Sequence, residues 1–541
     1  MTIAPKFQLT SFVKVSVLAL LSLAIAACSS TDGGNAPESY DIVINNGRVI
    51  DPETKFDGIR NVGVKDGRIV TITEDAITGN DTIDATGFVV SPGFIDTHTH
   101  SSVKYNIKMA MMDGVTTAMD YELGGMNIGA WYDQEMGQWP INYGTCVSHE
   151  QARMMVLDKL NLTEPIDAKD AFTLRAKSKE DGMESWSVQV STKAELENIT
   201  KILDENLRQG ALCIGTTVGY AAVGISSYEL FEVQRTAARY GRPIGSHTRY
   251  HGTNKPPQEA TLGADEVILN AMILDAPLVY SHNNDWGWWE IEEKLSIARE
   301  KGYNMWAEYY PYEAVSTAIG AAPLAPEIFI NVLGYSYEDA MYDPTQSKFL
   351  SQAEYEDVLA KDPGRTVIVY NRMRTEWMPD WLTLENVTIG SDAMWSNNPE
   401  DNWDTDPAKY AGHPRTSGSH TTILRLGREH KVSLTQSISQ LSYWPAKFLG
   451  KTGLTFFDER GRIQEGMVAD IVIFDPKTVK EGSSYDVGQN GLPPIGLPHV
   501  IVNGKFVKRD NQAIKEMAGL PVRYPVEETG RWQPVKAKQI K

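Results

Sequence analysis

The sequence is poor in cysteine, with only three cysteines among 541 residues. One of them, Cys28, lies in an N-terminal segment, so the rest of the chain can form at most one disulfide, between Cys146 and Cys213. Two cysteines this far apart in the sequence do not establish that the bond forms. Cys213 lies in the apolar run Ala211–Gly215 and is predicted to be a buried strand residue. Cys146 follows Ile141–Thr145, which is predicted to be a less apolar strand.

Positive charge is also scarce. The chain has 51 Lys and Arg against 70 Asp and Glu, a formal net charge of −19. Because the phosphates of nucleic acids bind to basic surfaces, this balance argues against nucleic acid as a partner. An acidic surface mostly keeps a protein soluble and does not by itself indicate a cationic substrate. A hydrophobic content of 42% and a charged content of 22% are ordinary for a globular protein.

Long apolar runs are scarce as well. Residues 15–27 form one, and it is too short to span a bilayer. Lysines precede it, as in a secretory signal, and it ends in two alanines followed by Cys28 and Ser29. This ending resembles a bacterial lipoprotein signal with lipidation at Cys28; the alternative is an ordinary signal peptide with an incidental cysteine. The resemblance implies a cell-envelope protein on the periplasmic side of the outer membrane, which contacts the membrane only through its lipid anchor.

Short strands are predicted near both ends of the remaining chain. Residues 40–90 alternate β-type runs with Asn-Gly and Asp-Gly turns, which is typical of hairpins. A second set of such runs lies within residues 456–525, and we expect the two sets to join into one small β-sandwich. The predicted segments are a signal peptide, a linker, the first sandwich part, a central domain, the second sandwich part and a C-terminal tail, at residues 1–27, 28–39, 40–90, 91–455, 456–525 and 526–541.

The central domain alternates short apolar strands with helical stretches, a pattern typical of parallel βαβ units. Eight strands are predicted, so the fold class is α/β, a (β/α)8 TIM barrel with its functional groups at the carboxyl ends of the strands. The strands are expected to end near Thr97, Glu122, Cys146, Thr217, His247, His282, Tyr309 and Asp392. The stretch from Ala321 to Glu385 is long for one crossover and indicates an insertion. Its run Thr366–Tyr370 is an alternative for the seventh or eighth strand.

Histidines close three of these strands. His98 and His100 follow one strand at positions i and i+2, so on an extended backbone both imidazoles point the same way and can reach one metal ion. His247 and His282 each end an apolar run as Ser-His, separated by the length of one βα unit. The alternative for each is a solvent-exposed or core histidine. Asp392 ends the last predicted strand, where it serves either as a catalytic group or as a helix N-cap.

Together these motifs resemble the amidohydrolase superfamily and, more narrowly, the N-acyl-D-amino-acid deacylase (D-aminoacylase) family. The resemblance covers nearly all of residues 40–525. The matching motifs, beyond His98 and His100, are Gly114–Thr117, Gly245–Arg249, Tyr309–Tyr312, Ser391-Asp392, His413–Arg415 and Gly466–Asp470. The resemblance implies hydrolysis of the amide bond of N-acyl-amino acids, with one or two divalent metal ions, zinc above all, as cofactor.

The chain departs from the family at the ligand that bridges two ions. Many superfamily members use a carbamylated lysine on strand four, but residues 211–217 contain no lysine. The deacylases use a cysteine at the end of strand two, and residues 119–124 contain no cysteine. Glu122 lies within one residue of that position and is predicted to bridge, with Asp120 as the runner-up and a plain salt bridge as the alternative. An oxygen ligand would loosen the preference for zinc. Asn284 stands where the family often has lysine.

The predicted metal ligands are His98, His100, Glu122, His247, His282 and Asp392. Asp392 is also expected to accept a proton from the attacking water and to return it to the leaving nitrogen. The resemblance assigns the substrate carboxylate to Arg415, whose guanidinium can bind it in a bidentate manner. The residues expected to contact the small-molecule substrate are Arg415, Tyr310, Arg249, Ser316 and His149. For Tyr310 and Arg249, a structural role is an equal alternative.

Three other functions remain open at this point. One is hydrolysis of a cyclic amide, as in dihydroorotase-like or hydantoinase-like enzymes, and another is dipeptide cleavage. The absence of a lysine on strand four argues against hydrolysis of a cyclic amide. The third, from a different class, is a surface lipoprotein that binds a metal or ligand without chemistry. The complete ligand set together with Asp392 weighs against it. The sequence does not determine the oligomeric state, the acyl group or the stereochemistry.

Overall fold

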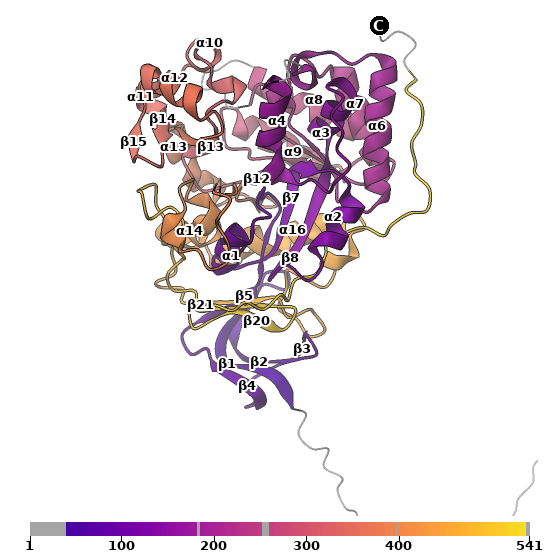
Figure 1. The fold of residues 1–541 in the computed structure, drawn as a ribbon. Helices are drawn as coiled ribbons and strands as arrows, with labels where there is room; N and C mark the ends of the chain where they lie inside the picture. Colours follow the sequence, from indigo (N-terminus) through magenta and orange to yellow (C-terminus); the bar gives the residue numbers. More distant parts are fainter. Residues whose placement is uncertain (1–38, 181–183, 252–258, 397, 537–541) are drawn as a thin grey trace, which may run out of the picture. The chain divides into compact units, whose positions relative to one another are not determined.

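The computed structural model describes residues 39–536 apart from 181–183, 252–258 and 397 (Figure 1). The predicted signal peptide and the expected lipidation site Cys28 lie outside the described residues. Among the helices of the described part, none combines the length and the apolar composition needed to span a bilayer.

Eight parallel strands form a sheet in the order β17-β12-β11-β10-β9-β8-β7-β6. They are β6 (Phe94–Asp96), β7 (Val115–Gly125), β8 (Asn142–Ser148), β9 (Ile214–Thr216), β10 (Ile244–Ser246), β11 (Leu278–Tyr280), β12 (Met305–Tyr309) and β17 (Thr388–Ile389). A parallel bridge between Thr99 and Ala393 joins the two ends of the sheet and closes the barrel. Each predicted strand end lies within three residues of an observed end. The predicted (β/α)8 fold class is confirmed.

Helices cover the outside of the barrel. In order along the chain they are α1 (Lys104–Met112), α2 (Ile128–Glu135), α3 (His149–Leu157), α4 (Ala171–Glu180), α5 (Ser185–Val188), α6 (Lys193–Arg208), α7 (Ser227–Ala238), α8 (Glu259–Leu274), α9 (Trp288–Glu300), α14 (Arg415–Glu429), α15 (Leu434–Ile438) and α16 (Trp444–Gly450). From α6 to α9, each helix packs against the next, as expected when successive βα units go round a barrel.

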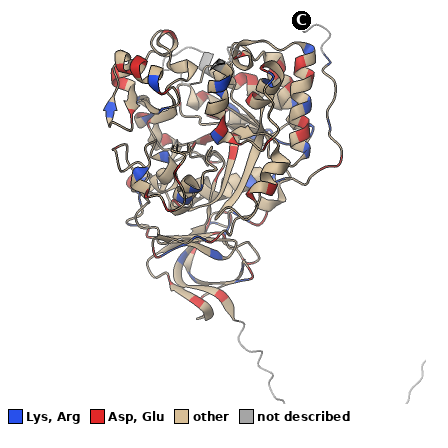
Figure 2. Cartoon of the chain, in the orientation of Figure 1, with Lys and Arg blue, Asp and Glu red and all other residues tan. Residues whose placement is uncertain are grey.

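Helix α6 shows why these segments fold as they do. Thr192 accepts a hydrogen bond from the backbone of Glu195, whose side chain returns one to the backbone of Thr192, so a capping box starts the helix. The buried residues Leu196, Ile199, Leu203 and Leu207 recur at spacings of three and four and form one apolar stripe facing the barrel. Lys and Arg alternate with Asp and Glu on the outer faces of such helices (Figure 2).

The two ends of the described chain share one nine-stranded sheet. Its strands are β1 (Tyr40–Asp51), β2 (Phe56–Lys65), β3 (Arg68–Thr73), β4 (Gly79–Asp84), β5 (Val89–Pro92), β18 (Ile471–Phe474), β19 (His499–Val502), β20 (Lys505–Arg509) and β21 (Gln512–Ala513). Antiparallel pairing of β5 with β18 joins the two segments. Asp66 and Gly67, at φ of 49° and 78°, form the predicted Asp-Gly hairpin turn. The domain boundaries at residues 90 and 455 stay predictions.

The stretch between β12 and β17 is an insertion with its own sheet. Its four strands, in the order β13-β16-β14-β15, are β13 (Ala314–Ala318), β14 (Met341–Asp343), β15 (Lys348–Phe349) and β16 (Thr366–Tyr370). Its helices are α10 (Pro326–Phe329), α11 (Tyr337–Ala340), α12 (Gln352–Lys361) and α13 (Met373–Trp381). Because β16 pairs antiparallel with β13, the alternative that placed Thr366–Tyr370 in the barrel is wrong. β17 takes that place, beside β12.

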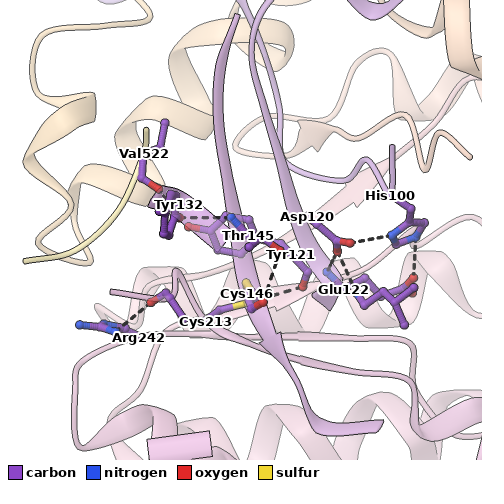
Figure 3. Close-up of a disulfide and its surroundings, with 12 residues drawn as sticks. His100, Asp120, Tyr121, Glu122, Tyr132, Thr145, Cys146, Cys213, Arg242 and Val522 are labelled. Atoms are coloured by element: carbon purple, nitrogen blue, oxygen red, sulfur yellow. Dashed lines mark hydrogen bonds and ion pairs between the residues drawn. A yellow bond between two sulfur atoms is a disulfide. The ribbon is translucent and has the colours of Figure 1, made fainter. Parts of the chain in front are cut away.

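A disulfide joins Cys146 and Cys213, which the sequence left undecided. Cys146 lies in β8 and Cys213 directly precedes β9, the neighbouring strand of the barrel, and the two Cα atoms lie 4.5 Å apart. The Cys213 sulfur also lies 3.7 Å from the carbonyl oxygen of Tyr121. Figure 3 shows that the bond lies beside the stretch of β7 that carries Glu122. The disulfide therefore ties β8 to the start of β9, beside the strand that carries Glu122.

We expect replacement of both Cys146 and Cys213 by serine to lower the free energy of unfolding by about 2–4 kcal/mol, since a cross-link restricts the unfolded chain. Thermal unfolding with and without a reductant measures this. The wild type should lose the same stability when reduced, and the double variant should not respond to the reductant. An oxidised wild type no more stable than the double variant would contradict the prediction.

Candidate metal centre

The predicted ligands come together at the carboxyl ends of the barrel strands. They lie on β7 or within four residues after the ends of β6, β10, β11 and β17, and they are His98, His100, Glu122, His247, His282 and Asp392. The donor atoms form two groups, each with all its atoms within 4.8 Å of one another. The first group is His98, His100, Glu122 and Asp392, and the second is Glu122, His247 and His282. Glu122 is common to both.

The Glu122 carboxylate lies between two pairs of histidines. Its Oε2 lies 3.2 Å from His98 Nε2 and 3.2 Å from His100 Nε2. Its Oε1 lies 3.2 Å from His247 Nδ1 and 2.8 Å from His282 Nε2. Burial alone would raise the pKa of Glu122, but the imidazoles of His98 and His282 lower it well below its usual range. An ionised carboxylate with one oxygen facing each pair has the geometry of a bridging ligand.

The spacing of the imidazole nitrogens fits a metal ion in each half. His98 Nε2 and His100 Nε2 lie 3.1 Å apart, and so do His247 Nδ1 and His282 Nε2. Two nitrogens bound tetrahedrally to zinc at 2.0–2.1 Å are separated by about 3.3 Å. The lone pairs of two imidazole nitrogens repel each other at this distance, and a cation bound between the nitrogens removes that repulsion. The donors therefore suit the expected divalent metal, with a place for two ions.

The first histidine pair is oriented by carboxylates. His98 Nδ1 donates to Glu308 Oε1, and Thr97 donates to Glu308 Oε2 at 2.8 Å. His100 Nδ1 donates to Asp120 Oδ2 at 3.0 Å. Each bond keeps the proton on Nδ1 and leaves Nε2 free to bind an ion. Asp120, the runner-up for the bridge, instead orients His100. Glu308 did not emerge from the sequence, although a glutamate inside the apolar strand β12 was a signal.

Asp392 faces the first half of the centre. Its Oδ1 lies 3.3 Å from His100 Nε2 and 3.5 Å from His98 Nε2, and its Oδ2 lies 2.9 Å from Arg415 Nη1. Burial alone would raise the pKa of Asp392, but the Arg415 guanidinium and then His98 hold it below its usual range. At φ of 52°, Asp392 has a left-handed backbone that few residues other than glycine adopt. The Asp392 carboxylate therefore lies, in its ionised form, beside the predicted metal ligands His98 and His100.

A cavity of about 130 Å³ opens over these ligands. One wall is the barrel mouth, with His100, Glu122, His247, His282 and Asp392. The opposite wall comes largely from the insertion and is mostly apolar, with Leu324, Phe329, Leu333, Tyr335 and Val369. A small molecule at the ligands would therefore have a polar side toward the barrel and an apolar side toward the insertion.

Two of the expected substrate contacts, Tyr310 and Ser316, line this cavity. Arg374 Nη1 donates to the Tyr310 hydroxyl at 2.7 Å, and burial raises the pKa of Tyr310 to about 12. Its phenol therefore keeps a proton that it can donate. Ser316 Oγ has no hydrogen-bond partner among the described residues. Arg415, the third expected contact, is buried, pairs with Asp392 and is not among the residues that line the cavity, although its Nε has no hydrogen-bond partner among the described residues.

The structure does not place His149 and Arg249 at the cavity, so these two expectations need correction. His149 begins α3, is buried, and has its Nε2 3.0 Å from Glu229 Oε1. Arg249 donates from Nε to Glu266 at 2.8 Å and from Nη1 and Nη2 to the carbonyls of Ala222 and Ile225. Both side chains are occupied by neighbouring elements and stabilise the fold.

No protein-family model matches the chain. An N-acyl-D-glutamate deacylase of Alcaligenes xylosoxydans xylosoxydans is 25% identical over 486 residues, which cover 86% of this chain and 93% of that protein. A D-aminoacylase of the same organism is 24% identical over 510 residues, 89% of this chain and 97% of that protein. These relatives confirm the resemblance to the deacylases that the motifs predicted.

Solved structures agree on the fold. A crystal structure of an N-acyl-D-glutamate deacylase from Bordetella bronchiseptica, complexed with zinc and a phosphonate inhibitor, covers 90% of this chain and all of its own, with a TM-score of 0.70 and 23% identity. A dihydropyrimidinase from Brevibacillus agri covers 90% of this chain and 99% of its own, with a TM-score of 0.55 and 20% identity. The fold of the chain is therefore more similar to that of this deacylase than to that of this dihydropyrimidinase.

Proposed function

We propose that this protein is a metal-dependent hydrolase that cleaves the amide bond of N-acyl-D-amino acids and releases a carboxylate and a free amino acid. The observation that carries the proposal is the Glu122 carboxylate between two histidine pairs, with the ionised Asp392 beside it. The deacylases that the chain resembles over most of its length support the substrate class.

Each residue of the centre has a distinct role in this reaction. A divalent ion, when bound, would polarise the amide carbonyl and activate a water. Asp392 accepts the proton of that water, because its carboxylate is ionised and faces the same ligands, and it then protonates the leaving nitrogen. Arg415 holds the other oxygen of Asp392 in place. Tyr310 and Ser316 offer hydroxyl groups to the substrate from the cavity wall.

Metal analysis combined with an amine-release screen tests the proposal. The purified protein should contain a divalent metal, lose its activity after chelation and regain it with zinc. N-acetyl-D-amino acids should be hydrolysed in preference to their L-enantiomers, dihydroorotate and hydantoins. Turnover confined to the cyclic amides would favour a cyclic-amide hydrolase. Bound metal without turnover of any amide would favour a surface lipoprotein that binds a metal but is not an enzyme.

The charges around the cavity favour a substrate with a neutral side chain. Arg175 lines the cavity, but its Nε and Nη2 each donate to Glu150 at 2.7 Å. Arg374 also lines it, but its Nε and Nη2 donate to Asp285 at 2.9 and 2.6 Å. Because both cations already have carboxylate partners, a second carboxylate on the substrate would lose its hydration without gaining a free cation. The apolar wall of the insertion suits an aliphatic side chain.

We therefore expect kcat/KM for N-acetyl-D-leucine to exceed that for N-acetyl-D-glutamate by at least about 10-fold. Steady-state kinetics with the two compounds measure the ratio. Glu150→Gln, which frees Arg175, should lower the ratio by improving the acidic substrate. A wild type that prefers N-acetyl-D-glutamate would contradict this choice of substrate.

We also propose that the protein is a lipid-anchored protein of the bacterial cell envelope, on the periplasmic side of the outer membrane. The N-terminal signal supports the anchor, and the Cys146–Cys213 disulfide is consistent with an oxidising compartment. Cys28→Ala should abolish labelling by radioactive fatty acid and move the protein from the membrane fraction to the soluble fraction. Unchanged labelling of this variant would contradict the anchor.

A further inference from the structure

His251, a histidine without an assigned role, lies against the second half of the metal centre. Its ring centroid is 4.2 Å from that of His282 and 4.7 Å from that of His247, and the residue lines the cavity. Its Nε2 lies 3.0 Å from Asp285 Oδ2. The side chain has 9% of its surface exposed. Its ring therefore packs on both predicted histidine ligands of this half, and Asp285 lies at ion-pair distance from it.

Asp285 is itself held by the insertion. Arg374 donates to Asp285 Oδ1 from Nε at 2.9 Å and from Nη2 at 2.6 Å, and Asn371 donates to the same oxygen at 3.1 Å. All three side chains are buried. Asn371 follows β16 and Arg374 lies in α13, so both belong to the insertion. A chain of polar contacts thus runs from the insertion through Asp285 to His251.

The two halves of the centre differ in how their histidines are oriented. His98 and His100 each donate from Nδ1 to a carboxylate, Glu308 and Asp120. His282 Nδ1 has no hydrogen-bond partner among the described residues. A histidine ligand usually needs such a partner to fix its ring. The ring of His282 must therefore be fixed by packing, and His251 contacts it closely.

We propose that His251 is a positioning residue for the second half of the metal centre, and that Asp285 and Arg374 hold it there. The insertion then supports ion binding at His247 and His282 as well as forming the cavity wall. The inference rests on the proposed metal-dependent function, because it presupposes an ion in each half. Loss of His251 should weaken the second ion and leave the first, which His98 and His100 bind, unaffected.

Metal titration of the intact protein tests this. The apoprotein is titrated with zinc, and bound zinc is determined by elemental analysis after dialysis against buffered zinc concentrations. We expect two ions in the wild type. In His251→Ala and in Asp285→Asn, the Kd of one of the two ions should rise about 10- to 100-fold, the usual effect of losing an orienting partner. The Kd of the other ion should not change.

His420→Gln is a matched control. His420 is buried, and its Nδ1 lies 3.1 Å from Asp113 Oδ2, but it does not line the cavity. It should keep both zinc affinities even if its Tm falls, which separates positioning from general loss of stability. A wild-type Kd for both ions in His251→Ala and Asp285→Asn would overturn the positioning role alone. A wild type that binds no zinc would instead overturn the proposed function.

Discussion

Asp392→Asn is expected to lower kcat at least about 100-fold, the usual contribution of a general base. The amide has nearly the same size as the carboxylate but cannot take up the proton of water. Asp392 is placed for that task because its Oδ1 lies 3.3 Å from His100 Nε2 and 3.5 Å from His98 Nε2, beside the predicted metal ligands. The first ion should remain bound, because His98, His100 and Glu122 still provide donors. Steady-state turnover of N-acetyl-D-leucine and zinc analysis of the same sample measure both effects.

Arg415→Met is the control for Asp392→Asn, because it removes the ion pair between the two residues without removing the proposed proton acceptor. It breaks the 2.9 Å contact between Arg415 Nη1 and Asp392 Oδ2 but leaves the carboxylate in place. We expect it to raise KM, because the resemblance assigns the substrate carboxylate to Arg415, and to lower kcat less than Asp392→Asn does. Near-normal kcat in Asp392→Asn would show that Asp392 is not the base.

Glu122→Gln is expected to lower kcat/KM at least about 1,000-fold, or about 4 kcal/mol of transition-state stabilisation. Glutamine keeps the length of the side chain, but its NH2 group cannot coordinate a cation, so one histidine pair loses its shared oxygen ligand. The wild-type oxygens lie 2.8–3.2 Å from the nitrogens of both pairs. Zinc titration should show weaker binding of at least one ion. Kinetics and bound zinc are measured on the same preparation.

Two further variants test whether Glu122 bridges. Glu122→Asp is shorter by one methylene and should reach only one histidine pair, so it should retain one zinc ion. Asp120→Asn removes only the partner of His100 Nδ1, and we expect the smaller, about 10- to 100-fold, loss of metal affinity that follows from such partners. Two ions bound with wild-type affinity in Glu122→Gln would argue that Glu122 forms an ordinary salt bridge.

Much of the barrel could be predicted from the sequence because its strands are short apolar runs with polar side chains at their ends. His98 and His100 are two residues apart on an extended backbone, so their common direction follows from strand geometry alone. His247 and His282 repeat the same strand ending one βα unit apart. Once eight parallel strands close into a barrel, such endings must face the same mouth. The position of Glu122 came from the resemblance and from the absence of cysteine in its neighbourhood.

The insertion shows where local patterns were insufficient. The run Thr366–Tyr370 is as apolar as a barrel strand, and nothing in its residues excludes it from the barrel. The pairing of this run with β13 places it in the insertion, and the pairing of β17 with β12 makes β17 the last barrel strand. His149 and Arg249 do not line the cavity, for a related reason. Both follow strand ends, but their side chains have partners on other elements that no local pattern identifies.

By itself, the sequence determined the barrel, the β domain made from both ends, and the histidines and Asp392 that face one mouth, because periodicity and strand ends are local properties. Only the tertiary structure decided that Cys146 bonds to Cys213, that Glu308 orients His98, and that His251 meets Asp285. These contacts join residues from separate strands or connections, and their distances depend on how the strands align and how the chain packs around them.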